Sequence, residues 1–169
     1  HHEVELGVII GSTMRDVSAP AAMGHVAGYF AAVDVTARCI QAKAKAKGLP
    51  WSAAKGYDTF CALSACVPRL ATREQGRGVA DGDIDALELH LSVDGEERQR
   101  GTCEQMTWKV PELLAHISTV CTLEAGDTVL TGTPEGVGPM RPGQRVAMGI
   151  TGLLDAEFHV VRRESPPSA

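Results

Sequence analysis

The chain has 169 residues, enough for one domain with a sizeable hydrophobic core. Hydrophobic residues make up 44% of it and charged residues 22%, and the net charge is −5 at pH 7. This acidic balance argues against a nucleic-acid binder or a basic membrane-surface protein, and no apolar run approaches the roughly 18 residues that span a bilayer.

The cysteine content argues against a disulfide framework or a zinc knuckle, because the number is odd and no Cys-x-x-Cys pair occurs. We therefore expect reduced thiols in the cytoplasm or the mitochondrial matrix. Small buried packing positions are the expected role of the five cysteines. They are Cys39, Cys61, Cys66, Cys103 and Cys121.

The first third of the chain alternates strands and helices. Apolar residues at positions 4, 6, 8 and 10 predict a strand that ends at Gly11, and its abrupt start predicts that residues are missing in front. Ser18 predicts the cap of a short helix around residues 19–25, and residues 26–33 predict a buried strand closed by Asp34.

A second helix is expected from Thr36, as its N-cap, to about Lys47, with Gly48 just beyond its end. Frequent proline and glycine predict mostly irregular structure over residues 49–82. The polar stretch 71–83 predicts a mobile surface loop.

The remaining elements are short. Alternating leucines at 87–93 followed by Asp94-Gly95 predict a hairpin, and apolar spacing over 110–117 predicts a helix. A short strand at 128–131 leads into the glycine-rich loop 132–138. A hairpin-like pair is expected at 146–150 and 154–160, and a frayed tail at 164–169. The pattern favours a mixed β fold with short helices, not a doubly wound α/β fold.

Three carboxylates are candidate metal ligands. Glu3 and Glu5 are two residues apart on the first predicted strand, so they share a face. Burying two carboxylates side by side is costly unless a cation neutralises them, and hard oxygen ligands suit Mg²⁺ or Mn²⁺. Asp34, at the end of the second strand, is the third candidate. The alternatives are a solvated edge strand with exposed acids and an aspartate that only caps a helix.

Other polar residues are candidate substrate contacts. Arg38 and Gln41 lie one turn apart at the start of the second helix, where free N–H groups attract anions. The loop Thr131–Gly138 lacks the Gly-Lys-Ser/Thr ending of a P-loop, but it can present N–H groups and the Thr133 hydroxyl to a carboxylate. Ordinary surface polarity is the alternative for these residues, and for Lys55 a solvated loop position.

Taken together, five stretches resemble the fumarylacetoacetate hydrolase family, and within it the acylpyruvase and oxaloacetate decarboxylase branch. They cover nearly the whole chain. They are HHEVELGVIIG (1–11), VAGYFAAVDVTAR (26–38), KGLPWSAAKGYDTF (47–60), LSVDGEERQRGT (91–102) and LTGTPEGVGPM (130–140).

The resemblance implies a β-roll of mixed strands that forms a homodimer, with one catalytic domain over 1–163. It implies that Mg²⁺, or Mn²⁺, is held by Glu3, Glu5 and Asp34. Lys55 would stabilise an enolate. The residues that would touch a 2-keto acid substrate are Arg38, Gln41 and Thr133.

Two departures from the family pattern stand out. Family members carry a segment before the metal motif, with a His/Glu pair on a lid that activates water. That lid segment is expected to be missing here, and His25 stands in the wrong context to replace the pair. Cys39 stands where many relatives have aspartate.

The implied activity is cleavage of a C–C bond in a short 2-keto acid through a pyruvate enolate. Acylpyruvate hydrolysis and oxaloacetate decarboxylation both fit. A hydratase or isomerase acting on related 2-keto acids is one alternative. The other is a catalytically incompetent homologue that binds metal or ligand and lacks the lid.

Overall fold

The computed structural model describes residues 1–70 and 78–162, which form two β-sheets and several short helices. The larger sheet has the strand order β4-β3-β2-β1-β7. Its strands are β1 (Val4–Ile10), β2 (Val26–Asp34), β3 (Cys61–Leu70), β4 (Val79–Ala80) and β7 (Thr128–Leu130).

The smaller sheet has the order β6-β5-β8-β9, and all its neighbours are antiparallel. Its strands are β5 (Glu88–Val93), β6 (Glu96–Thr102), β8 (Arg145–Ile150) and β9 (Leu154–His159). In the larger sheet β3 and β4 pair in parallel, so the strands are mixed. The predicted mixed β architecture with short helices is confirmed.

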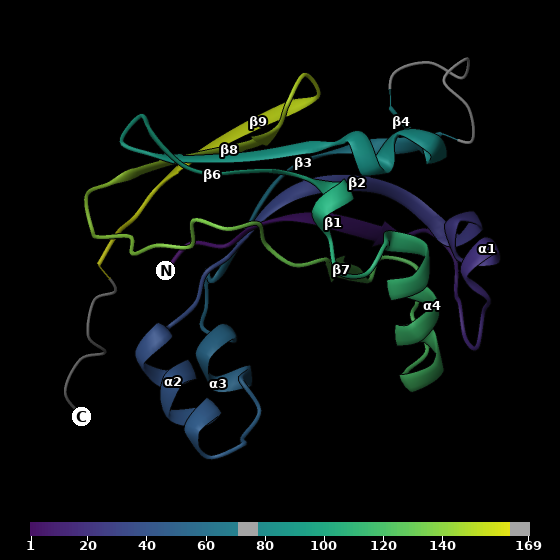
Figure 1. Cartoon of the computed structure of the whole chain (residues 1–169), viewed down its shortest axis with the longest axis horizontal. Helices are drawn as coiled ribbons and strands as arrows, with labels where there is room; N and C mark the ends of the chain where they lie inside the picture. The colour runs from purple at the N-terminus through teal and green to yellow at the C-terminus, as the bar shows by residue number, and fades with distance from the viewer. Residues whose placement is uncertain (71–77, 163–169) are drawn as a thin grey trace.

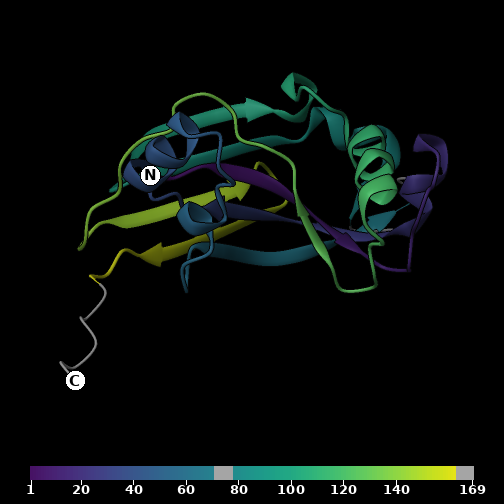
Figure 2. The same ribbon diagram turned by 90° about the horizontal axis from the view of Figure 1, so that it is seen from below.

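The helices lie mainly on the face of the larger sheet that points away from the smaller sheet (Figure 1). Figure 2 shows α2 and α3 over one end of that face and α4 over the other. The helical segments are α1 (Ala19–Ala22), η1 (Met23–His25), α2 (Arg38–Ala46), α3 (Ser52–Lys55), η3 (Asp81–Ala86), η4 (Cys103–Gln105) and α4 (Val110–Val120).

The hydrophobic core lies between the two sheets and follows from the alternation in β1. The side chains of Val4, Leu6, Val8 and Ile10 are each 1% exposed or less, and they belong to one cluster with residues of β5 and β8. Burial of each such side chain contributes about 1.5–3 kcal/mol. Because side chains alternate along a strand, the opposite face of β1 is left to carry the acidic residues.

The predicted hairpin is confirmed, with Asp94 and Gly95 at its turn. Their φ angles are 53° and 82°, and a two-residue hairpin turn of this type requires positive φ at both positions. The helix predicted near 110–117, the short strand near 128–131 and the closing strand pair are also present.

The prediction of irregular structure over 49–82 is wrong, because this region contains α3 and the ten-residue strand β3. The pairing of β3 with β2 joins Asp34 to Cys61 and Gly28 to Pro68. These contacts come from a distant part of the chain, so local sequence signals do not reveal the strand. Residues 71–77 of the predicted mobile loop lie outside the described residues, whereas 79–83 form β4 and the start of η3.

Two further local predictions are corrected. Thr36 is not the N-cap of α2, because the cap is Ala37 and the Thr36 hydroxyl donates to the carbonyl oxygen of Asp34 at 3.1 Å. All five cysteines are free, but only Cys103 is buried, so the prediction of buried packing positions is wrong for the other four.

The tail predicted at 164–169 lies outside the described residues. Among described residues, no helix has the length and apolar character needed to cross a membrane.

Candidate metal centre

Three carboxylates meet on the helix-covered face of the larger sheet. Glu3 directly precedes β1, Glu5 lies within it, and Asp34 ends the neighbouring strand β2. The backbone N–H of Asp34 donates to the carbonyl oxygen of Glu3 at 2.9 Å, which fixes the two strands side by side. Oxygen atoms of the three side chains lie within 4.8 Å of one another. The strand pairing therefore brings together residues that are about 30 positions apart in sequence.

Two cationic side chains contact this cluster. The Lys55 ammonium, from α3, donates to Glu3 at 2.8 Å and also to Asp34. The Arg38 guanidinium, from the first turn of α2, donates to the other oxygen of Glu3 at 2.6 Å. Helices α2 and α3 thus deliver two positive charges to one small acidic site.

The Arg38 guanidinium also donates to the side-chain oxygen of Gln41, one turn further along α2, at 2.5 Å. Gln41 is buried although it is polar, which is unusual for a residue of a two-turn surface helix. The structure therefore places Arg38 and Gln41 on the site-facing side of α2, next to the acidic cluster.

The glycine-rich loop 132–138 also contacts the acidic cluster. The backbone N–H of Gly132 donates to Glu5 at 2.6 Å. Gly132 has a φ of 100°, a conformation that glycine adopts without strain.

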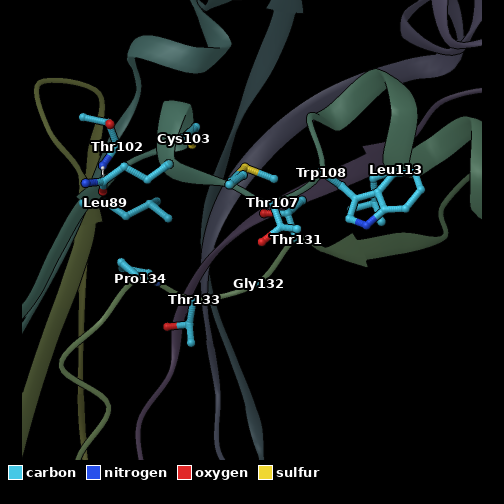
Figure 3. Close-up of a pocket in the computed structure, with 13 residues that line it drawn as sticks. Leu89, Thr102, Cys103, Thr107, Trp108, Leu113, Thr131, Gly132, Thr133 and Pro134 are labelled. Carbon is cyan, nitrogen blue, oxygen red and sulfur yellow. Dashed lines mark hydrogen bonds between the residues drawn. The ribbon is translucent and has the colours of Figure 1, made fainter.

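Thr133, the residue after Gly132, lies on a cavity of about 180 Å³. The cavity is lined by Gly132, Thr133 and residues of β5, η4 and α4 (Figure 3). Figure 3 shows Trp108 and Leu113 on one side of this cavity and Leu89, Thr102 and Pro134 on the other. No charged side chain is among its lining residues.

Burial and neighbouring charges shift the pKa values of Glu5 and Glu3 in opposite directions. Burial raises the pKa of Glu5 to about 7, and the nearby Asp34 and Glu3 carboxylates add to the rise against the opposing Gly132 N–H. Burial also acts to raise the pKa of Glu3, but the hydrogen bond and charge of Lys55, together with hydrogen bonds from Thr36 and Arg38, outweigh it, so that pKa lies below its usual value. Burial would lower the pKa of Lys55, yet its bonds to Asp34 and Glu3 raise it.

The donor set fits a hard divalent cation. It consists of three carboxylates that can each supply one oxygen within a single small volume, the chemistry that Mg²⁺ and Mn²⁺ prefer. The raised pKa of Glu5 shows that its negative charge is under-compensated by the protein alone. A divalent cation bound by Glu3, Glu5 and Asp34 would supply that compensation.

Cation binding should therefore weaken at acidic pH. A ligand must be deprotonated to bind, and the pKa of Glu5 is about 7, so a proton competes with the cation below that pH and is absent above it. We expect the apparent Kd for Mn²⁺ to be about tenfold higher at pH 6 than at pH 8. Isothermal titration calorimetry at both pH values, in buffers of different ionisation enthalpy, also reports the released proton. A Kd that is constant over this range contradicts the expectation.

Sequence reasoning missed two residues that hold the site together. His2 lies just before β1 and Gln99 lies on β6, and their buried side chains bond to each other at 2.8 Å. A signal for Gln99 exists in the hairpin register, because Gln99 pairs with the core residue Leu91 and so must point inward. Nothing in the sequence around His2 indicates its role.

Comparison with known proteins agrees with the fold. The family model described as "Fumarylacetoacetate (FAA) hydrolase C-terminal" matches residues 1–161. The mitochondrial oxaloacetate tautomerase FAHD1 of Arabidopsis thaliana is 51% identical over 168 residues, covering 99% of this chain and 71% of the relative. The mitochondrial oxaloacetate decarboxylase of Dictyostelium discoideum is 47% identical, covering 97% of this chain and 72% of the relative.

A solved structure shares the architecture of this chain. The crystal structure of fumarylpyruvate hydrolase from Pseudomonas aeruginosa, in complex with Mn²⁺ and pyruvate, superposes with a TM-score of 0.84 at 33% identity. The match covers 96% of this chain and 66% of that one. The fold class expected from the sequence resemblance is thereby confirmed. With a family match along nearly its whole length and relatives about half identical to it, the chain belongs to the fumarylacetoacetate hydrolase family.

Proposed function

We propose that this chain cleaves a C–C bond in a short 2-keto acid with the help of a divalent cation, by acylpyruvate hydrolysis, oxaloacetate decarboxylation or both. The observation that carries the proposal is the cluster of Glu3, Glu5 and Asp34 within 4.8 Å, in contact with the Lys55 ammonium. The relatives named as an oxaloacetate decarboxylase and a fumarylpyruvate hydrolase support it.

The proposed cation is Mg²⁺, with Mn²⁺ as a substitute, bound by Glu3, Glu5 and Asp34. The Mn²⁺ in the fumarylpyruvate hydrolase structure supports a divalent metal. When bound, the cation supplies positive charge that stabilises negative charge on the oxygens of the substrate.

The remaining roles follow from charge and position. Breaking the bond between C3 and C4 leaves its electron pair on C3, delocalised to the C2 oxygen as a pyruvate enolate. The Lys55 ammonium stabilises that charge, the kind of electrostatic effect that usually dominates catalysis. Arg38 pairs with the C1 carboxylate, Gln41 is oriented by Arg38 to hold a carbonyl or water, and Thr133 donates its hydroxyl to the carboxylate.

The two reactions differ in what happens at C4. Decarboxylation of oxaloacetate releases CO₂ and needs no water, only stabilisation of the enolate. Hydrolysis of an acylpyruvate needs a general base that delivers water to the C4 carbonyl. Both end when a proton is added to C3 to give pyruvate.

Pyruvate release tests the proposal. Oxaloacetate and acetylpyruvate are each supplied to the purified chain with and without Mg²⁺, and pyruvate is followed with lactate dehydrogenase. Because free Mg²⁺ also decarboxylates oxaloacetate, an Asp34→Asn variant at the same Mg²⁺ concentration is the matched control. Equal pyruvate release by the unsubstituted chain and this control contradicts the proposed activity. Cation binding without turnover would identify a metal-binding homologue that lacks catalysis.

A second candidate is keto–enol tautomerisation of oxaloacetate, which the names of the relatives from Arabidopsis thaliana and Oryza sativa favour. It uses the same enolate charge stabilisation, because removing a proton from C3 leaves the same electron pair as losing CO₂. The two activities are separated by following the ultraviolet absorbance of the enol form alongside pyruvate. Tautomerisation removes the enol absorbance without releasing pyruvate.

We also propose that the protein acts as a homodimer in the cytoplasm or the mitochondrial matrix. Exposed apolar residues on β3, including Leu63 at 51% exposure, support a contact between copies along this strand. Five free cysteines fit a reducing compartment, as do the names of the mitochondrial relatives. Light scattering after size-exclusion chromatography measures the mass, and a monomeric mass contradicts the dimer.

A further inference from the structure

The buried side chain of Gln99 connects the strand that carries the acids to the loop that carries Thr133. Gln99 lies on β6, in the other sheet, and is 1% exposed. Its amide nitrogen donates to the Thr133 hydroxyl oxygen at 2.8 Å and to the Pro134 carbonyl oxygen at 3.0 Å. Its amide oxygen accepts from the backbone N–H of Val4 at 3.1 Å and lies 2.8 Å from Nδ1 of His2. Both donors and both acceptor positions of this amide are occupied.

The orientation of this amide is fixed by two backbone groups. The Val4 N–H can only donate and the Pro134 carbonyl can only accept, so the amide of Gln99 must have its oxygen at Val4 and its nitrogen at Pro134. It follows that the Thr133 oxygen accepts a hydrogen bond from Gln99. The hydroxyl proton of Thr133 is then directed away from Gln99 and is available to another acceptor.

Two backbone contacts hold the loop at the same place. The N–H of His2 donates to the carbonyl oxygen of Gly138 at 2.8 Å. Gly136 has a φ of 95°, and a Cβ there would lie 2.1 Å from the carbonyl oxygen of Arg98, so the loop rests directly on β6. The loop therefore has little freedom to shift relative to Gln99.

The two segments that Gln99 joins also carry or contact the acidic cluster. His2 and Val4 flank Glu3 in sequence, and the Gly132 N–H donates to Glu5. Gln99 itself bonds to none of the three carboxylates in the described structure. Its bonds act on the two segments whose separation sets the distance between the acids and the Thr133 hydroxyl.

We propose that Gln99 is a positioning residue for substrate binding, which makes the Thr133 hydroxyl a hydrogen-bond donor and fixes it relative to Glu3 and Glu5. The ligand that it serves is the carboxylate of a 2-keto acid. The inference rests on the proposed function, because it assigns the donor at that same site.

Replacing the Gln99 amide by a carboxylate keeps the shape of the side chain but reverses the direction of its hydrogen bond with Thr133. Gln99→Glu keeps an oxygen for Val4 and His2, but its other oxygen accepts the Thr133 proton and faces the Pro134 carbonyl without a donor. Thr133 then no longer donates to a substrate. The effect expected is loss of keto-acid affinity, while the acidic cluster is left intact.

The experiment measures Mn²⁺ binding and pyruvate binding separately by calorimetry. For Gln99→Glu we expect a Mn²⁺ Kd within about threefold of the unsubstituted chain. The pyruvate Kd at saturating Mn²⁺, and the KM in turnover, should rise about tenfold or more, as for loss of one hydrogen bond to a charged group. Gln144→Met, which removes a half-buried amide from a distant turn, is the control and should change neither value.

A double-substitution cycle separates positioning from a merely structural role. If Gln99 acts through the Thr133 hydroxyl, Gln99→Glu should not weaken pyruvate binding further once Thr133→Val has removed that hydroxyl. Gln99→Met runs the same cycle if the glutamate variant fails to fold. Unchanged pyruvate affinity in a folded variant, or losses that add in the cycle, would overturn this inference alone. No pyruvate binding by the unsubstituted chain with Mn²⁺ would overturn the proposed function and this inference with it.

Discussion

Asp34→Asn is expected to reduce the affinity for Mg²⁺ or Mn²⁺ by about two orders of magnitude and to abolish the cation-dependent release of pyruvate. An amide oxygen is a neutral, weaker ligand, and the variant removes one of three negative charges that lie within 4.8 Å of one another. The shape of the side chain is preserved, so the pairing of β1 with β2 should persist. Loss of an outer partner of a ligand costs 10- to 100-fold, and loss of a ligand itself should cost at least as much.

Thermal unfolding with added cation measures this effect without relying on turnover. A cation at 100 times its Kd stabilises the folded chain by about 2.7 kcal/mol, but by only about 0.4 kcal/mol if its Kd is 100-fold higher. Tm of the unsubstituted chain should therefore rise on adding Mn²⁺ much more than that of Asp34→Asn. Asp58→Asn is a suitable control, since Asp58 is an exposed aspartate that follows α3, the helix that carries Lys55. An equal rise in Tm for Asp34→Asn would remove Asp34 from the set of metal ligands.

Lys55→Met is expected to lower kcat by about 10²–10³ while cation binding persists, because it removes a charge that stabilises the developing enolate. Methionine retains much of the length and apolar surface of the lysine stem. In the structure the ammonium is bonded to Glu3 and Asp34, two of the proposed ligands. Without it those carboxylates are less neutralised, so the affinity for Mn²⁺ should be unchanged or higher.

The Lys55 test is specific because kcat should fall while the affinity for the cation does not. A variant that disturbs folding lowers kcat and cation affinity together, whereas Lys55→Met should lower only kcat. Lys43→Met, on the exposed side of α2, should change neither quantity. Turnover at the unsubstituted rate, measured as pyruvate release at saturating Mg²⁺, would exclude Lys55 from the mechanism.

Local sequence patterns predicted the first strand and the first hairpin correctly, because each of these segments contains its own signal. The period-two alternation of β1 separates a core face from an acidic face, and it predicts that Glu3 and Glu5 share a side. The Asp94-Gly95 turn determines the β5–β6 hairpin because both residues tolerate positive φ. These features depend on neighbours within a few residues, so they can be read without knowing the fold.

The site itself required contacts between distant segments. The bond between Lys55 and Glu3 spans 52 positions, and that between Gln99 and Val4 spans 95. Nothing local distinguishes Lys55 from a solvated loop lysine, and only the family resemblance indicated it. Strand β3 was missed for the same reason, because its pairing with β2 compensates for a composition that favours irregular structure.

The sequence alone therefore determined which residue types are present for metal and keto-acid chemistry, and which face of the first strand carries two of them. The tertiary structure decided how they are charged and held. Burial between sheet and helices raises the pKa of Glu5 to about 7, and strand pairing sets the distances among the acids. Both depend on which segments exclude water from one another, a property of the packed chain that no single segment contains.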